Sequence, residues 1–239
     1  MSQGAPAGRR AFIFDVDGVL LASPHERAWR EALDGLAEPA RFTTALYQAE
    51  VAGKPRLDGA LAALAALGLP DARRRAPAYA EAKQRRLDGI VAAEGITAFP
   101  DALRFVRALA ERGWPMAAAS SSRNAESMMR MVPLGEGRTL RDAFAARICG
   151  RALRHGKPDP EIFLLAAAEL GAEPAGCVVA EDAPAGIRAA RAGGMTALGI
   201  ARFGDAAGLR AAGADRVVAS FDEIRIDDLA PNRPPGDAA

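Results

Sequence analysis

Carboxylate, hydroxyl and ammonium side chains occur at four places in the chain, each at the end of a short apolar run or in the loop after it. The runs AFIF, MAAAS, ARIC and CVVA have the composition of buried β-strands. The side chains concerned are Asp15 and Asp17, Ser120, Lys157, and Glu181 with Asp182. Together these groups could bind a metal ion and a phosphoryl group, provided that the fold brings them to one place.

The carboxylates point to a divalent cation. Asp15 and Asp17 are separated by one residue, and Gly18 allows the backbone to turn directly after them. With Glu181 and Asp182 at the same sheet edge, four negative charges would repel one another strongly. A hard cation relieves this repulsion, and a ligand set made only of oxygen favours Mg²⁺. Because Mg²⁺ commonly bridges protein carboxylates and phosphate oxygens, we expect a phosphorylated ligand.

The remaining groups could hold the phosphoryl oxygens. Ser120, Ser121 and Ser122 supply hydroxyl donors, a helix predicted after them offers free N–H groups, and Lys157 adds a positive charge. Simpler interpretations exist for each motif. DVDG could be a turn with solvated acids, one serine could be a helix N-cap, and the Glu–Asp pair could cap the turn APAG. The occurrence of all four motifs in order, each beside a strand end, favours one shared site.

The elements that must position these groups follow an alternating pattern. We expect strands over 10–15, 115–120, 145–149, 176–182, 195–201 and 215–220. Helical periodicity predicts helices over 101–113, 124–132, 159–171 and 183–194. This alternation predicts an α/β fold with a Rossmann-like, mostly parallel sheet covered on both faces. Ligands of such sheets bind at the carboxyl ends of the strands.

One segment interrupts this pattern. From Ser23 to about residue 94 the chain is rich in Ala, Leu, Arg and Glu, and no convincing strand occurs. Helical spacing is visible over 25–36, 40–51, 58–69 and 79–91. We therefore predict an inserted α-helical unit between the first strand and the rest of the sheet.

Composition excludes several classes of protein. The chain has 239 residues, of which 50% are hydrophobic and 26% charged, as in a folded globular protein. A net charge of +1 provides no broad basic field for nucleic acid or anionic membrane. Cys149 and Cys177 form no C-x-x-C pair, which argues against a disulfide framework or structural zinc. The first apolar run is too short for a signal peptide or a membrane span, so we expect a cytoplasmic protein.

The scarcity of lysine in the chain helps to select candidate site residues. Of the 31 basic residues only three are lysines, namely Lys54, Lys83 and Lys157. In a chain so biased toward arginine, a lysine can mark a place where a bulky planar guanidinium does not fit. Chance is an equally good explanation for any single lysine, so independent support is required.

The motifs FDVDGV, AASSSRN, GKPDPEIF and AEDAPAGI stand in the order and spacing of the haloacid dehalogenase superfamily. The chain resembles its β-phosphoglucomutase-like subfamily, with a helical cap, from about residue 10 to about residue 203. The resemblance implies a discontinuous α/β core domain over 1–22 and 97–239 and a helical cap domain over 23–96. We expect residues 230–239 to be a disordered tail.

The resemblance also implies catalytic roles in the core. Asp15 matches the nucleophile that forms an aspartyl-phosphate, and Asp17 matches the general acid and base. Ser120 matches a phosphate ligand, and Lys157 matches the lysine that neutralises the transferring phosphoryl group. Asn124 matches a nearby polar contact, with Ser121 beside it. The metal set implied for Mg²⁺ is Asp15, the Asp17 carbonyl, Glu181 and Asp182.

Further matches lie in the cap, where the substrate would be chosen. HERAW resembles a His-x-x-x-Trp motif and implies that His25 contacts substrate, with Trp29 nearby. AGKPR implies Arg56, with Lys54 beside it, and AKQRR implies Lys83. The alternatives are a helix-start residue for His25 and a solvated helix face for Arg56 and Lys83. The connection from Gly18 to His25 is also shorter than the family pattern.

These observations predict an Mg²⁺-dependent enzyme that transfers a phosphoryl group, through an aspartyl-phosphate, from a small phosphorylated metabolite such as a sugar phosphate. A phosphatase is the leading interpretation, and a β-phosphoglucomutase-type phosphomutase is the alternative. A non-catalytic ligand-binding protein of the same fold is a third possibility, but the retained Asp15, Asp17, Lys157 and Asp182 argue against it. We expect no nucleic acid or membrane partner and a monomer or weak homo-oligomer.

Overall fold

The structure is a computed structural model that describes residues 10–229. Its centre is a six-stranded sheet in the order β5-β2-β1-β6-β7-β8, and every neighbouring pair is parallel. The strands are β1 Ala11–Phe14, β2 Met116–Ser120, β5 Ala146–Cys149, β6 Cys177–Glu181, β7 Thr196–Ile200 and β8 Arg216–Val218. The predicted α/β class is confirmed, and the predicted tail over 230–239 lies outside the described residues.

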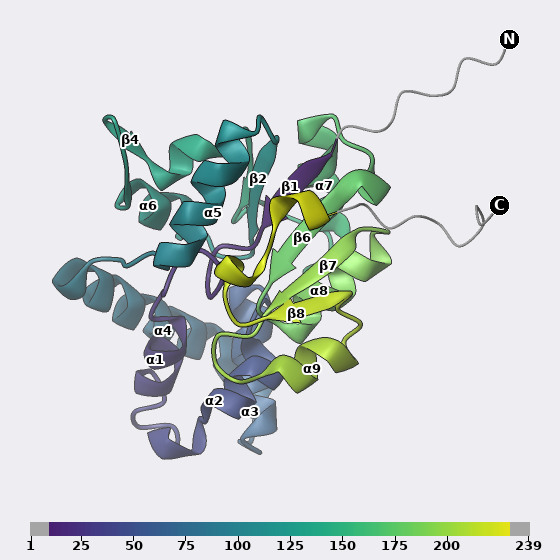
Figure 1. Cartoon of the computed structure of the whole chain (residues 1–239). Helices are drawn as coiled ribbons and strands as arrows, with labels where there is room; N and C mark the ends of the chain where they lie inside the picture. Colours follow the sequence, from purple (N-terminus) through teal and green to yellow (C-terminus); the bar gives the residue numbers. More distant parts are fainter. Residues whose placement is uncertain (1–9, 230–239) are drawn as a thin grey trace, which may run out of the picture.

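Each face of the sheet carries its own apolar layer, because successive side chains of a strand point to opposite faces. Phe12 and Phe14 of β1 pack with residues of α5 (Pro100–Glu111) and α6 (Ala125–Arg130) on one face. Ala11 and Ile13 pack on the other face with α7 (Glu161–Leu170), α8 (Pro184–Ala192) and α9 (Ala206–Ala211). Figure 1 shows these helices flanking the sheet. β1 is therefore buried on both faces and between two neighbours.

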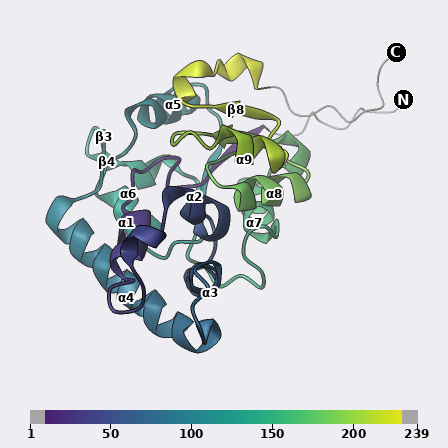
Figure 2. The same cartoon turned by 90° about the horizontal axis from the view of Figure 1, so that it is seen from below.

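A group of helices lies beyond one end of the sheet, as Figures 1 and 2 show. Its members are α1 (His25–Glu31), α2 (Thr44–Leu46), α3 (Arg56–Ala66) and α4 (Ala72–Glu94), which we call the helical module. Trp29, Phe42, Leu64 and Tyr79 belong to its own buried cluster. The Tyr79 hydroxyl donates to the Trp29 carbonyl oxygen at 2.8 Å, which ties α4 to α1. The predicted division into core and cap domains at the stated boundaries stays a prediction.

Two predictions for this region differ from the structure. The helix predicted over 40–51 is divided into the 3₁₀ turn Pro39–Arg41, α2 and the π-helical turn Tyr47–Val51, because Thr43 caps a new helix by accepting from Leu46 N at 3.1 Å. α4 is longer than predicted, since it begins at Ala72 and continues through Pro77. Elsewhere the sequence analysis missed α9 and the hairpin of β3 (Pro133–Gly135) and β4 (Arg138–Thr139).

Two connecting segments join the helical module to the sheet and run side by side. The Ala22 N–H donates to the Thr97 carbonyl at 2.9 Å, and the Phe99 N–H donates to the Leu20 carbonyl at 3.0 Å. An isolated bridge pairs Leu21 with Ala98. This double connection places the module directly over the carboxyl end of β1.

A buried ion pair fastens the start of α5 to the end of the sheet. Arg202 donates to both carboxylate oxygens of Asp101 at 3.1 and 3.0 Å, and the two side chains are only 9% and 8% exposed. The Asp101 carboxylate also accepts from the Ser220 hydroxyl and from Phe221 N. The Arg202 guanidinium lies 3.9 Å from the centre of the Phe99 ring. All of these groups pack beside the connecting segments.

The length and apolar character of the described helices bear on whether the chain could span a membrane. Over 10–229, none is both long enough and apolar enough to cross a bilayer. Cys149 and Cys177 are free thiols. A cytoplasmic location, the absence of a nucleic acid partner and a monomeric or weakly oligomeric state stay predictions.

Replacement of Asp101 should destabilise the fold. Asp101→Ala leaves the buried Arg202 charge without its partner, and we expect a loss of about 3 kcal/mol in the free energy of unfolding. Arg104→Ala, which removes the exposed pair with Asp222, should cost less than about 1 kcal/mol. Urea denaturation measures both. Equal losses for the two variants would contradict this assignment.

Candidate active site

The predicted catalytic side chains converge at the carboxyl end of the sheet. β1 lies between β2 and β6, so Asp15, Ser120 and Glu181 meet at the same edge. The Ser120 hydroxyl donates to Asp17 Oδ2 at 3.1 Å, across 103 positions of sequence. The Asp15 N–H donates to the Ala180 carbonyl at 2.9 Å, which fixes the end of β1 against β6. Strand order therefore produces this cluster.

Lys157 lies beneath the cluster, in the loop between β5 and α7. Its side chain is fully buried, and its ammonium donates to Asp15 Oδ1 at 2.6 Å and to Glu181 Oε1. Burial alone would lower the pKa of Lys157, but the charges of Asp15 and Glu181 outweigh it and raise the pKa above its usual value. The ammonium is therefore a fixed positive charge against the end of β1.

The carboxylates remain crowded despite this lysine. Burial raises the pKa of Asp15 to about 8, with Lys157 opposing the shift and Glu181 adding to it. Burial and the neighbouring Glu181 also raise the pKa of Asp182 well above its usual value. A group of oxygen atoms, one each from Asp15, Glu181 and Asp182, lies within 4.8 Å of one another. One lysine cannot neutralise three buried acids, and the oxygen atoms of these acids form a donor set that suits a hard divalent cation.

At Gly18 and Gly186 the backbone lies so close to the acids that only glycine fits. A Cβ at Gly18, where φ is +84°, would lie 2.0 Å from Asp182 Oδ2. A Cβ at Gly186 would lie closer still to the carboxylate of Glu181. Both oxygens of Glu181 already accept, one from Lys157 and the other from Ala183 N at 3.1 Å. Asp15 and Asp182 are thus the carboxylates best placed to face a cation.

His25 begins α1 and reaches the cluster from the helical module. Its Nε2 lies 3.1 Å from Asp17 Oδ1, and its Nδ1 lies 2.5 Å from the Lys83 ammonium. Because Lys83 supplies the proton at Nδ1, the hydrogen of the neutral ring sits on Nε2 and faces Asp17. Burial alone would raise the pKa of Asp17, but His25 outweighs it and lowers the pKa to about 2. The short connection after Gly18 therefore still brings His25 to Asp17.

Lys83 comes from α4 and is 3% exposed. Burial lowers its pKa to about 7, although Asp17 opposes the shift. The ammonium also lies 5.1 Å from the centre of the Trp29 ring. The solvated helix face considered for Lys83 is thus wrong, because the side chain points inward to His25.

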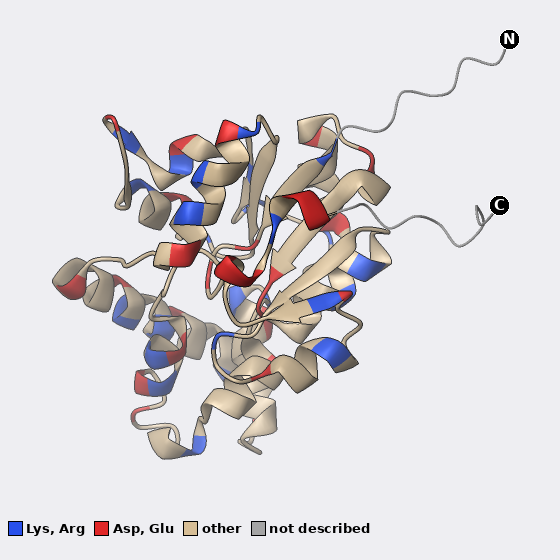
Figure 3. Cartoon of the chain, viewed as in Figure 1, with Lys and Arg blue, Asp and Glu red and all other residues tan. Residues whose placement is uncertain are grey.

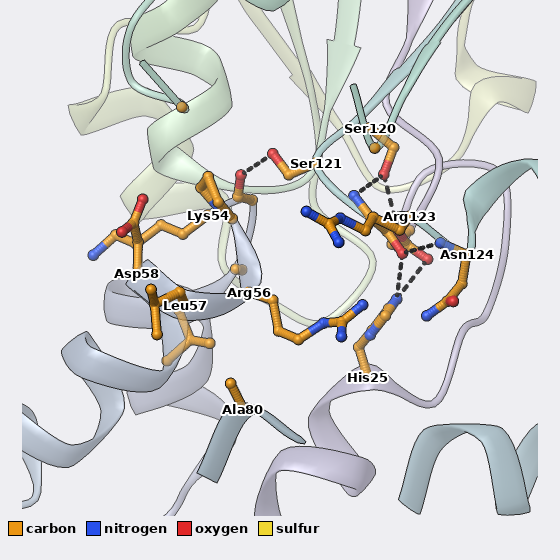
Figure 4. A pocket seen from close by; sticks show the side chains of 18 of the residues that line it. His25, Lys54, Arg56, Leu57, Asp58, Ala80, Ser120, Ser121, Arg123 and Asn124 are labelled. Carbon is orange, nitrogen blue, oxygen red and sulfur yellow. Dashed lines mark hydrogen bonds and ion pairs between the residues drawn. The ribbon is translucent and has the colours of Figure 1, made fainter. Parts of the chain in front are cut away.

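A cavity of about 590 Å³ separates the helical module from the sheet edge. The guanidinium groups of Arg56 and Arg123 enter it from α3 and from the loop after β2, as Figure 4 shows. Neither donates a hydrogen bond to any residue within 10–229. Burial, and then the charge of Arg123, lower the pKa of Arg56. Two positive groups without partners give the cavity a place for an anion.

The predicted site residues all lie at this cavity or directly beneath it. Those of the predicted residues that line the cavity are Asp15, Asp17, His25, Lys54, Arg56, Lys83, Ser120, Ser121, Asn124 and Asp182. The Ser121 hydroxyl donates to the Gly53 carbonyl at 2.9 Å and so joins the sheet side to the helical module. Lys54 extends to the opposite end of the cavity from His25 (Figure 4). The catalytic, substrate and metal roles of these residues stay proposals.

The sequence analysis named Ser122 only as a hydroxyl donor for the phosphoryl group, and it missed Arg123 as a residue of the site. Arg123 faces Arg56, and the Ser122 hydroxyl lies 3.5 Å from His25 Nε2. Both belong to the SSSRN motif, so their position between Ser120 and Asn124 was the available signal. Their direction could not be read from sequence, because the loop turns before α6 begins.

Figure 3 shows blue and red segments, and thus charges of both signs, on both the helical module and the sheet side. No broad field of one sign accompanies the site. The pair of guanidinium groups of Arg56 and Arg123 inside the cavity is therefore a local feature of the charge distribution.

Comparison with known proteins identifies the class. The sequence model of the haloacid dehalogenase-like hydrolases matches residues 9–194. The chain belongs to this family, and it is an enzyme of the family's phosphatase and phosphomutase type.

The individual relatives include both phosphomutases and phosphatases. The chain is 35% identical to the β-phosphoglucomutase of Mycobacterium tuberculosis, over 92% of this chain and 93% of that one. It is 32% identical to the fructose-1-phosphate phosphatase YqaB of Escherichia coli, over 79% of this chain and 94% of that one. Among solved structures, an archaeal β-phosphoglucomutase from a hyperthermophilic Pyrococcus superposes with a TM-score of 0.72 at 30% identity, covering 92% and 96% of the two chains. The predicted family and subfamily are confirmed.

Gly18→Ala should disable the site without unfolding the protein. The new Cβ would displace the Asp182 carboxylate, so we expect a loss of more than about 100-fold in phosphatase activity toward an aryl phosphate. Gly35→Ala is a matched control, because Gly35 also has a positive φ (+75°) but nothing within 4 Å of its Cβ position. Steady-state kinetics with a thermal melt distinguish the two. Equal activity of both variants would refute the role of this close contact.

Proposed function

We propose that the protein is a sugar-phosphate phosphomutase that works through a phosphorylated Asp15. The observation that carries the proposal is the pair of guanidinium groups of Arg56 and Arg123, which donate no hydrogen bond to the described residues and lie in the same cavity as Asp15. A phosphatase needs to hold only the phosphoryl group that it removes. A mutase must also hold a second phosphate while the sugar presents its other end. The similarity to β-phosphoglucomutases over nearly the whole chain supports this proposal.

In the proposed reaction, a carboxylate oxygen of Asp15 attacks phosphorus and the bond from phosphorus to the leaving sugar oxygen breaks. Lys157 holds Asp15 through Oδ1 and places positive charge beside the transferring group. Asp17, which is ionised at rest, takes the proton of the attacking sugar hydroxyl when the phosphoryl group leaves Asp15, and returns that proton to the leaving sugar oxygen when Asp15 is phosphorylated again. Ser120 and His25 hold the two oxygens of Asp17 in position for this transfer.

The site also fits Mg²⁺, which relatives in this family generally use. We infer that Asp15, Asp182 and the Asp17 backbone carbonyl hold the ion, with Glu181 beside them. The ion would offset the negative charge of the carboxylates and of the incoming phosphoryl group. The crowded acids and the space that only glycine leaves at position 18 support this inference.

A sugar-phosphate phosphatase is the second candidate. It uses the same Asp15 and Asp17, with water in place of the sugar hydroxyl. The similarity to a fructose-1-phosphate phosphatase, over 94% of that enzyme, favours it. The two functions differ in how well the closed cavity excludes water.

One assay distinguishes these candidates. The protein is incubated with Mg²⁺ and β-glucose 1-phosphate, primed with a trace of the 1,6-bisphosphate, beside a panel of other sugar phosphates. Glucose 6-phosphate without free phosphate identifies a mutase. Free phosphate from one member of the panel identifies a phosphatase and its substrate.

Asp15→Asn should abolish turnover of every substrate, because an amide oxygen cannot form the aspartyl-phosphate. The fold should persist, and circular dichroism checks this. Activity above a few per cent of the unmodified protein would remove Asp15 as the nucleophile.

Arg56→Ala should raise KM for a substrate with two phosphates by about tenfold or more, because the second phosphate loses a charged donor. KM for a minimal aryl phosphate should change less than about twofold, since it has no second phosphate. The two substrates are compared under the same conditions. Equal changes in both would place Arg56 outside the substrate site.

A further inference from the structure

A pair of side-chain amides joins the helical module to the sheet side at the edge of the cavity. Gln84 of α4 donates through Nε2 to Asn124 Oδ1, and Asn124 donates through Nδ2 to Gln84 Oε1, both at 3.2 Å. The two residues are 40 positions apart in sequence. The pair is therefore a contact of the tertiary structure and depends on the module lying over the site.

The Gln84 amide is held in one orientation from its other side. Its Nε2 also donates to Asp88 Oδ1 at 2.6 Å, one turn further along α4. Only the NH₂ end of the amide can donate to an ionised carboxylate, so Oε1 is left to accept from Asn124. This arrangement orients the amide before it meets the loop, which reduces the ordering cost of the contact.

The contact connects two parts of the site. On the module side, Lys83 directly precedes Gln84 and contacts His25, which faces Asp17. On the sheet side, the Asn124 N–H donates to the Ser122 hydroxyl at 3.2 Å, and Arg123 enters the cavity between these two residues. Gln84 itself does not line the cavity. Its influence on substrate would therefore pass through the residues that it positions.

A second contact between the sheet side and the helical module lies just before α3. It is the bond from the Ser121 hydroxyl to the Gly53 carbonyl. Ser121 and Asn124 belong to the same loop after β2, so this loop is fastened to the module at both of its ends. The side chain of Arg123 comes from the part of the loop between these fastenings (Figure 4).

We propose that Gln84 is a positioning residue whose amide pair with Asn124 holds the module closed over the cavity and so decides whether the phosphoryl group passes to a sugar hydroxyl or to water. The inference rests on the proposed phosphoryl transfer. When the pair is lost, α4 and the loop after β2 separate more often, and water enters while Asp15 is phosphorylated. The chemistry of Asp15 itself does not depend on Gln84.

The first test needs no substrate. Amide hydrogen exchange of the whole protein is compared for the unmodified chain, Gln84→Ala and the control Arg85→Ala, whose exposed side chain lies next to Gln84 on α4. We expect about tenfold faster exchange over 121–125 in Gln84→Ala only, as two hydrogen bonds are lost. Exchange equal to that of Arg85→Ala would overturn the proposal.

The second test measures the consequence for transfer. With the primed sugar phosphate, Gln84→Ala should raise the ratio of free phosphate to isomerised product about tenfold, while hydrolysis of an aryl phosphate stays within about twofold. Equal losses on both substrates would indicate general damage and overturn the proposal. Failure of the unmodified protein to isomerise any sugar would instead reject the mutase function, and the exchange result would still decide the role of Gln84.

An isosteric series separates hydrogen bonding from packing. Gln84→Glu keeps the side-chain shape but places two carboxylates together at Asp88, so exchange and phosphate release should rise at least as much as in Gln84→Ala. With Asp88→Asn added, the new amide donates to the carboxylate at position 84, which can then accept from Asn124 Nδ2 but cannot donate to Asn124 Oδ1. This double variant should therefore reverse part of the effect, whereas Asp88→Asn alone should change little. An unaltered Gln84→Glu variant, or no recovery in the double variant, would refute the amide pair as the cause.

Discussion

The contact of the buried Lys157 ammonium with Asp15 and Glu181 is the interaction on which the rest of the site depends. All three side chains are almost completely buried, where a single uncompensated charge would be very costly. The three groups compensate one another only because β1 and β6 are neighbours and the loop before α7 returns beneath them. The apolar layers on both faces of the sheet exclude water from this cluster. They also hold oxygen atoms of Asp15, Glu181 and Asp182 within 4.8 Å of one another.

The groups that we propose as catalytic and those that we propose choose the substrate come from different parts of the chain. Asp15, Asp17 and Ser120 stand on strand ends, where the sheet fixes their positions. His25, Arg56 and Lys83 stand on helices that reach the site only through the paired segments around Leu21 and Ala98. In such an arrangement, the groups on the sheet can stay the same from one relative to another while the residues of the helical module differ. This is consistent with relatives that include both phosphomutases and phosphatases.

Several polar contacts cross the boundary between the two parts. His25 with Asp17, Ser121 with the Gly53 carbonyl, and Gln84 with Asn124 all cross it. The last two pairs join neutral groups, and hydrogen bonds of this kind each stabilise the observed arrangement only modestly. In our proposal, the choice between water and a sugar hydroxyl depends on contacts such as the amide pair of Gln84 and Asn124.

The sequence by itself determined the α/β class and the helical insertion, and it singled out the motifs that the sheet brings together, because strand ends, turn glycines and carboxylate motifs are local features. It could not determine that Arg123 faces Arg56, that Lys83 turns inward to His25, or that Gln84 pairs with Asn124. Those contacts join segments far apart in sequence, and their geometry follows from how the module lies over the sheet. The division of 40–51 into short turns likewise depends on the Thr43 cap rather than on periodicity. Tertiary structure decided these points, because side-chain direction and burial are set by packing and not by spacing along the chain.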